Sequence, residues 1–187
     1  YRVDRAGALG VKVGFTVAAG VDQALIYRVA TVTIKVADTN GVGRPGYLIR
    51  IFNGPDGSGT QWGNATTDAS GLATFYLIPA GAYGFKVERS GAVSGTTGFT
   101  VSPGTEQTLT YTVATVTIKV ADSAGVGKAG YLVRVFNGAN GAGAEWGNST
   151  SDANGLVSFY LLEGSYGYSV ERSSAVSNKV GFAVSSG

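Results

Sequence analysis

The hydrophobic pattern of residues 109–120 divides this stretch into two strands. β-branched and aromatic residues dominate it, and it contains no Gly or Pro, so we expect extended chain. Its apolar residues lie at odd positions in the first half and at even positions in the second half (Leu109, Tyr111, Val113; Val116, Ile118, Val120). Because side chains alternate between the two faces of a strand, a single strand cannot bury both sets in one core. We therefore expect two strands from successive domains, joined at Ala114 and Thr115. Residues 25–36 carry the same pattern.

An internal repeat with a period of 84 residues organises the chain. Residues 30–71 align with residues 114–155 without a gap, and 28 of the 42 aligned residues are identical. Residues 1–29 align at the same offset with residues 85–113. So long a period indicates successive domains rather than the turns of a solenoid. The expected domains are the last strands of a preceding repeat or a donor-strand segment (1–29), a complete β-sandwich repeat (30–113), and a β-sandwich repeat that lacks its last strand (114–187).

Within the complete repeat, apolar alternation and turn residues follow one another about every 10 residues, which is typical of a β-sandwich. No segment has a helical period. Turn residues separate the strands, for example Pro79, Ala80 and Gly81. About seven strands are expected, with these inward-facing residues: Val32, Ile34, Val36; Tyr47, Ile49, Ile51; Ala73, Phe75, Leu77; Tyr83, Phe85, Val87; Phe99, Val101; Leu109, Tyr111 and Val113.

The order of the turn motifs resembles that of a known family. The motifs are V-x-I-x-V-x-D-x-x-G, then P-G-Y-x-I-x-I, then T-D-x-x-G-x-A-x-F-x-L-x-x-x-G-x-Y. They are similar to prealbumin-like (Ig-like) domains, in particular the Cna B-type repeats of collagen adhesins and the carboxypeptidase regulatory-like repeats of bacterial or archaeal surface proteins. The resemblance covers residues 30–113 and 114–184. It implies tandem β-sandwiches that serve as stalk or spacer modules on cell surfaces and in pili.

The chain departs from the family pattern at the positions of the internal isopeptide bond. The resemblance places the bond-forming Lys at Val36 and Val120, and the Glu at Val87 and Val170. The last strand, residues 107–113, contains no Asn. We therefore expect an aliphatic core in place of this cross-link.

Composition argues against most enzyme classes. The chain has neither Cys nor His, the residues that most often act as nucleophile, general base and metal ligand. Its 14 basic and 12 acidic residues give a net charge of +2 without a basic run, so no nucleic-acid partner is expected. No apolar run approaches the length of a membrane helix. We expect a non-enzymatic, extracellular cell-surface protein.

Asp and Asn residues at the predicted turns are candidate calcium ligands, because short oxygen-bearing side chains suit this ion. They are Asp38, Asn40, Asp68, Asp122 and Asp152. The ordinary role of such residues is to cap turns, and Asn40 aligns with Ala124, which weakens the case for a metal site. No cofactor is expected, with calcium as the alternative.

A repeated Trp-Gly-Asn-x-Thr segment supplies two candidates for sugar chemistry. Asn64 and Asn148 lie in N-x-T sequons, which carry a glycan if the host has the machinery. Trp62 and Trp146 could stack on a sugar ring in an adhesin module that binds a glycan or a host-surface ligand. The other interpretation is that each Trp pins its Gly-rich loop over the end of the sandwich, and we favour it.

Several apolar residues fall on the outward side of the predicted strands. They are Leu48, Phe52, Leu72, Tyr76, Leu132, Phe136, Leu156 and Tyr160. A sandwich with water outside would alternate apolar and polar residues at these strands, so the set predicts a lateral interface. The alternative is that the Gly-rich loop at residues 54–64 covers these side chains.

The two ends of the chain suggest a mode of polymerisation. The repeat at 114–187 has no counterpart of residues 107–113, whereas residues 23–29 form a spare copy of that strand (Gln23, Leu25, Tyr27 and Val29 carry its pattern). A sheet that lacks an edge strand accepts an incoming one. The partner would be a copy of this chain. The alternative is that the sequence is a window from a longer tandem chain. Either way, the expected function is a rigid extracellular stalk or filament.

Overall fold

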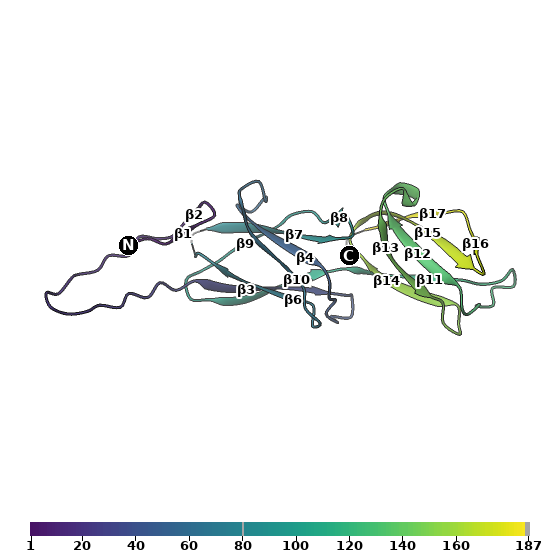
Figure 1. The fold of residues 1–187 in the computed structure, drawn as a ribbon, viewed down its shortest axis with the longest axis horizontal. Coiled ribbons are helices and arrows are strands. Elements are labelled where there is room, and N and C mark those ends of the chain that lie inside the picture. Colours follow the sequence, from purple (N-terminus) through teal and green to yellow (C-terminus); the bar gives the residue numbers. More distant parts are fainter. Residues whose placement is uncertain (80, 186–187) are drawn as a thin grey trace. The chain divides into compact units, whose positions relative to one another are not determined.

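The computed structural model describes residues 1–79 and 81–185 (Figure 1). Ala80, in the predicted turn after Pro79, lies outside the described residues, as do Ser186 and Gly187 at the end of the predicted last domain. The described chain is all-β with a single 3₁₀ turn, η1 (Ala139–Gly141), which confirms the predicted fold class. In this part of the chain no helix is long or apolar enough to cross a membrane.

Two facing sheets are built from the strands between residues 30 and 112 (Figure 1). One has the order β10 (Glu106–Thr112), β3 (Ala30–Ala37), β6 (Leu72–Leu77). The other has the order β5 (Gln61–Thr66), β4 (Leu48–Asn53), β7 (Ala82–Arg89), β8 (Ala92–Val93), and β9 (Thr97–Thr100) also pairs with β7. The predicted inward rows from Val32 to Val87 are buried. Val36 and Val87, the family's cross-link positions, are fully buried valines.

The strands from residue 114 onward repeat this order with one difference. β11 (Ala114–Lys119) pairs with β14 (Leu156–Leu161). The other sheet has the order β13 (Glu145–Thr150), β12 (Leu132–Asn137), β15 (Gly164–Arg172), β16 (Ala175–Val176), with β17 (Val180–Val184) on β15. Among the described residues β11 has one neighbour, whereas its counterpart β3 has two.

The compact units of the chain do not coincide with the repeat boundaries. The first unit contains Tyr1–Lys35, Pro45–Val87 and Gly95–Tyr111. The second contains Val36–Arg44, Glu88–Ser94 and the chain from Thr112 onward. Thus one turn and one hairpin from the repeat at 30–113 pack with the residues of the next repeat. The domain boundaries drawn from the sequence period remain a prediction. The compact units cross the boundary at residues 113 and 114.

The stretch at 109–120 forms two strands, as its change of parity predicts. β10 ends at Thr112 and β11 begins at Ala114, and the two strands belong to different sheets. The single residue between them, Val113, is 0% exposed. Its earlier copy differs, because residues 25–29 lie outside any sheet and β3 begins only at Ala30. The expected strand there is wrong for this structure, since a strand needs a neighbouring strand to pair its backbone.

Glycine pairs in the sheets make room for the loops that follow β4 and β12. Gly84 of β7 lies opposite Gly98 of β9, and a Cβ on either would lie 2.9 Å from the carbonyl oxygen of Pro55. Gly167 and Gly181 form the same pair in the second sandwich, beneath η1. Each loop therefore crosses its sheet in direct contact with the backbone.

We predict that Gly84→Val destabilises the protein by about 1–3 kcal/mol, because the side chain would displace the loop that carries Pro55. The matched control is Gly63→Val in β5, where an added Cβ has no neighbour within 4 Å. Urea unfolding followed by circular dichroism measures both free energies. Equal effects of the two substitutions would show that the loop does not rest on the glycine pair.

Candidate functional site

The hairpin of β1 (Asp4–Arg5) and β2 (Ala8–Leu9) contacts β4 and β5 within the first compact unit. Its turn residues Ala6 and Gly7 have φ angles of 50° and 82°. The Arg5 guanidinium lies 5.2 Å from the centre of the Trp62 ring. The side-chain amide of Asn53 donates a hydrogen bond to the carbonyl of Ala6. The turn thus places a cation over an indole ring and a backbone carbonyl against a side-chain amide.

The same contact recurs in the second compact unit. The β7–β8 hairpin turns at Ser90 and Gly91, with φ angles of 48° and 85°. Arg89 lies 5.6 Å from the Trp146 ring centre, and the Asn137 amide donates to the carbonyl of Ser90. The Ser90 hydroxyl also donates to the Trp146 carbonyl over 3.3 Å. We call each turn a tip (residues 5–7 and 89–91) and each Trp–Asn pair a socket (Trp62 with Asn53; Trp146 with Asn137).

A third tip lies between β15 and β16, at Arg172, Ser173 and Ser174. Ser173 and Ser174 have φ angles of 48° and 70°, so the turn has the shape of the other two. All three residues are exposed. Arg172 donates to the carbonyl of Ala129 and lies over the Tyr131 ring. No socket contacts this tip within residues 1–79 and 81–185.

Buried tyrosines hold the sockets in place. The Trp62 ring packs edge-on against Tyr83 with centroids 5.8 Å apart, and Trp146 packs on Tyr166 in the same way at 5.7 Å. The Tyr83 hydroxyl donates to the Ile78 carbonyl over 2.7 Å. Burial of this ring raises the pKa of Tyr83 to about 12, so the hydroxyl stays a donor at physiological pH. The aromatic cluster therefore fixes the indole that the tip contacts.

The burial of the two tryptophans bears on the adhesin alternative. Trp62 is 6% exposed and Trp146 is 5% exposed. Arg5 or Arg89 lies over each ring, and a tyrosine packs against it. Little ring surface remains for a sugar. The sequence interpretation missed the arginine partners, although Arg5 and Arg89 are 84 positions apart and could have been found in the repeat alignment.

The outward apolar residues do not form one face in each repeat. Leu48 and Phe52 lie on β4, whereas Leu72 and Tyr76 lie on β6 in the other sheet. Their counterparts divide in the same way between β12 (Leu132, Phe136) and β14 (Leu156, Tyr160). The alternation along a strand shows that a residue points outward, but it does not say which sheet the strand joins. A single lateral patch is therefore excluded, and lateral contact through one of the two faces stays a prediction.

Lysines cover two of these residues. Lys86 of β7 has its ammonium 5.5 Å from the Phe52 ring centre, and Lys179 has its ammonium 3.7 Å from that of Phe136. The two lysines are not at equivalent repeat positions. Both repeats thus place a lysine ammonium over the equivalent phenylalanine, although the lysine comes from a different part of each repeat. Tyr76, at 61% exposed, is the most open of the predicted interface residues.

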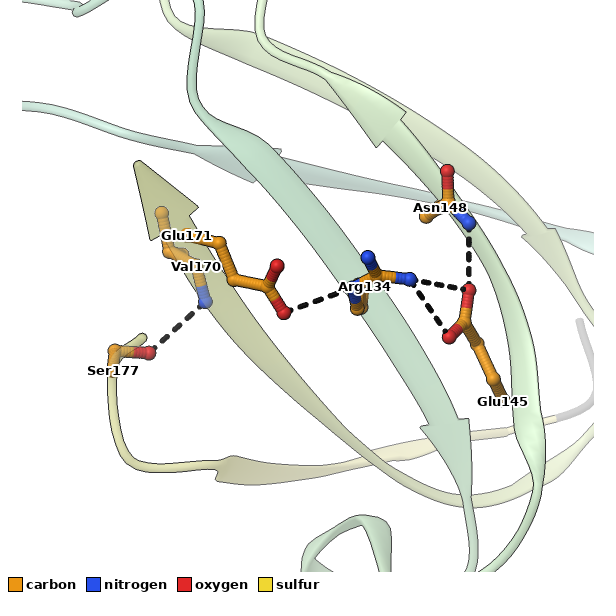
Figure 2. Close-up of polar contacts among 6 residues, drawn as sticks. All are labelled: Arg134, Glu145, Asn148, Val170, Glu171 and Ser177. Atoms are coloured by element: carbon orange, nitrogen blue, oxygen red, sulfur yellow. Dashed lines mark hydrogen bonds and ion pairs between the residues drawn. The ribbon is translucent and has the colours of Figure 1, made fainter. Parts of the chain in front are cut away.

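An ion-pair network crosses β13, β12 and β15 in the second sandwich (Figure 2). Arg134 donates to Glu171 over 2.8 Å and to Glu145 over 3.1 Å. The pKa of Arg134 is raised, and the hydrogen bond to Glu171 is the largest cause, followed by the one to Glu145. The Asn148 amide donates to Glu145 over 2.6 Å, and this bond is the main cause of the lowered pKa of Glu145.

The two sequon asparagines lie within strands rather than on a loop. Asn64 is in β5 and Asn148 is in β13, and both are exposed. The nitrogen of Asn148 that would carry a glycan is the atom that binds Glu145. A glycan would replace one of the two hydrogens on this nitrogen, and glycosylation stays a prediction at both sites.

Asp38 closes the turn after β3. One carboxylate oxygen accepts the backbone N–H groups of Asn40 and Val42, each over 2.9 Å, and the other pairs with Arg44. The bond to Arg44 is the largest cause of the lowered pKa of Asp38. Arg44 also lies 3.3 Å from the Tyr160 ring centre, within the second compact unit.

The other candidate calcium ligands also bind backbone N–H groups. Asp122 accepts two of them and pairs with Lys128 over 2.6 Å, in place of the arginine. Asp68 and Asp152 each accept two. No group of three His, Cys, Asp or Glu residues that could hold a metal ion occurs within the described ranges. These oxygens stabilise turns.

The edge of β11 that has no neighbouring strand among residues 1–79 and 81–185 marks where the predicted donor strand would bind. In the first sandwich, Thr31 donates to the Thr105 carbonyl and Val113 to the Ala37 carbonyl, so β3 and β10 run in the same direction. Residues 23–29, which would supply a copy of β10, contain the predicted donor positions Gln23, Leu25, Tyr27 and Val29. They lie outside the sheets, with Leu25 47% exposed and Ile26 75% exposed.

Comparison with known proteins gives similarities of fold only. No family model matches the chain, and no curated protein is similar to it. A Streptococcal ancillary pilin has a TM-score of 0.41 and 17% identity, over 84% of this chain and 59% of the pilin. BcpA, the major pilin subunit of Bacillus cereus, has a TM-score of 0.38 and 10% identity, over 84% and 96%. Fervidolysin from Fervidobacterium pennivorans, a keratinolytic enzyme, has a TM-score of 0.37 and 17% identity, over 77% and 25%.

We predict that stability falls at acid pH in a way that Asp38 controls. Its pKa is lowered in the folded state, so its stabilising contribution is complete above the unfolded pKa of about 4 and disappears as the pH falls through the lower folded pKa. Asp38→Asn should lower the melting temperature at pH 7 and flatten its decline below pH 4. Asp122→Asn, at the more exposed counterpart, is the matched comparison and should have the smaller effect. Parallel pH profiles of Asp38→Asn and the parent protein would refute this role.

Proposed function

We propose that this protein is a structural element of an extracellular stalk or filament, in which tandem β-sandwiches form a rigid rod. The observation that carries the proposal is the passage from β10 to β11 through the single buried residue Val113. A flexible linker would let the two sandwiches rotate freely, whereas one buried residue restricts rotation to a few backbone angles.

The interleaved packing supports the same conclusion. The second compact unit includes Val36–Arg44 and Glu88–Ser94, which precede it in sequence. Within that unit, Arg44 lies over the Tyr160 ring and the tip at Ser90 contacts its socket. Each contact is modest by itself, but together they link segments of the repeat at 30–113 to residues of the next repeat. We expect them to oppose bending at Val113.

The composition is consistent with a mechanical rather than a catalytic role. The chain has no Cys or His. Its buried polar groups serve the fold: Thr67 and Ser151 accept backbone N–H groups at the starts of β4 and β12, and Asp38 caps a turn. The hydroxyls of the buried Tyr83 and Tyr166 donate to backbone carbonyls.

We predict that the orientation of the two sandwiches is narrowly distributed and that a flexible insertion at Val113 broadens it. Spin labels on Thr108→Cys in β10 and Lys119→Cys in β11 are unique, because the chain has no cysteine. Pulsed electron-paramagnetic resonance should give a narrow distance distribution. An eight-residue Gly/Ser insertion after Val113 should widen it, since such linkers behave as random coils.

The same insertion between Ala153 and Asn154 is the control, because it lies outside the segment between the two labels. It should leave the distribution narrow. A distribution that is broad before any insertion would overturn the rigid-rod proposal.

We further propose that rods lengthen by strand addition. Residues 23–29 of one molecule would pair with the free edge of β11 in another, as β10 pairs with β3. The donor positions align with residues of β10 and with the residue that follows it. The aligned pairs are Gln23 with Gln107, Leu25 with Leu109, Tyr27 with Tyr111, and Val29 with Val113. Val116 of β11 and Val120, which directly follows this strand, are half-buried and correspond to fully buried Val32 and Val36, so an added strand would complete this side of the core.

We predict concentration-dependent association in sedimentation velocity, reduced by an excess of a peptide with the sequence of residues 23–29. The peptide would occupy the β11 edge and block the next molecule. A peptide with Leu25→Asp and Tyr27→Asp is the control, because it lacks the apolar face. A protein that stays monomeric at all concentrations, or an equal effect of both peptides, would reject strand addition.

A further inference from the structure

We propose that the β15–β16 tip, Arg172 to Ser174, docks onto a second copy of this chain and enters the Trp62–Asn53 socket of that copy. The proposal rests on the polymerisation proposed above and names a second contact in the same joint. The two contacts seen within the chain show what the tip requires: an indole for the arginine and an amide for the turn carbonyl.

The backbone of the third tip is already shaped for a socket. Its first turn residue has a φ of 48°, as in the second tip, and its second is Ser174 with a φ of 70° where the other tips have glycine. A serine in the left-handed region is less favourable than a glycine. The turn nevertheless keeps the shape that presents its first carbonyl to an asparagine in the other two copies.

The side chains of the third tip match as well. Arg172 corresponds to Arg5 and Arg89, which lie over the two indoles. Ser173 corresponds to Ser90, whose hydroxyl donates to the Trp146 carbonyl. The tip therefore carries the cation, the carbonyl and the hydroxyl that the second socket binds.

Space for a partner exists beside this tip. A groove of about 410 Å³ is lined by the tip together with Gly130, Leu132, Thr150 and Glu171. In the preceding repeat, the equivalent hairpin Glu88–Ser94 is part of the second compact unit. The third tip, by contrast, is exposed within the described part of the chain.

The receiving socket is occupied by a hairpin that can be exchanged. In the first unit the β1–β2 hairpin fills the Trp62–Asn53 socket, and it is held by strands of two residues each. When residues 23–29 of the second copy add to β11, its β3 follows directly, as β11 follows β10. The tip of the first molecule then takes the place of the β1–β2 hairpin, and the joint seen within the chain is rebuilt between molecules.

Cysteine cross-linking tests this contact, because the natural chain contains no cysteine. Ser173→Cys protein and Asn53→Cys protein are mixed at a concentration where association is measured, then oxidised and run on a non-reducing gel. We expect a disulfide-linked dimer that depends on the mixture. The positive control is Ser90→Cys with Asn137→Cys in one chain, which should close an internal disulfide because it joins a tip to its socket.

The negative control replaces Asn53→Cys with Asn64→Cys, an exposed residue of β5 outside the socket. Dimer yields equal to this control would overturn the tip proposal. If peptide-sensitive association persists at the same time, strand addition stands and only the tip contact fails. If neither association nor cross-linking occurs, polymerisation itself is rejected.

A second measurement keeps the proposal open to test if the cysteines perturb the turn. Arg172→Ala should weaken the association constant about tenfold by removing the cation from the indole. Lys12→Ala, which removes an exposed cation outside the tip, the socket and the two pairing strands, is the matched control and should leave the constant within about twofold. Equal constants for Arg172→Ala and the parent protein would overturn the proposal.

Discussion

The structure depends on the requirement that a strand alternate its side chains between two faces. In residues 109–120 the apolar positions change parity, so the chain must leave one core and enter another within a single residue. The change occurs at Val113, which is fully buried, so no flexible linker separates the two strands. The second compact unit begins at Thr112, next to this residue, and it also contains the turn at Asp38 and the tip at Ser90 from the preceding repeat.

A second constraint, the close approach of loops to glycine pairs, fixes the sockets. The loop after β4 can cross the sheet only because Gly84 and Gly98 have no side chains. This path sets the end of β4, where Asn53 meets the tip, and it leads the chain into β5, where Trp62 packs on Tyr83. The high glycine content is therefore partly a requirement of packing and only partly one of turns.

Much of the fold could be predicted from the sequence, and the candidate site could not. The alternation of apolar and polar residues predicted the buried rows from Val32 to Val87, because a two-residue period with one apolar face is typical of a half-buried strand. It could not assign strands to sheets, so Leu48 and Leu72 were placed on one face although β4 and β6 lie in different sheets. It also overpredicted a strand at residues 25–29, where strand propensity has no neighbour to pair with. The tips were missed because a surface arginine is usually solvated, and only the position of Trp62 in space gives Arg5 a partner.

Comparison of the two repeats shows which features the fold requires. Asp38 pairs with Arg44 and Asp122 with Lys128, so the turn needs a cation but not a particular one. The lysine over the phenylalanine comes from β7 in one repeat and from the residue before β17 in the other. The tip–socket contact differs from both, since Arg and Trp, and Asn and the turn carbonyl, are the same in each copy. A cation that only neutralises a charge or covers a ring can be exchanged, whereas a fork-shaped guanidinium on an indole beside a carbonyl–amide bond fixes both partners. The geometry of the joint therefore demands more of the sequence than the surface around it.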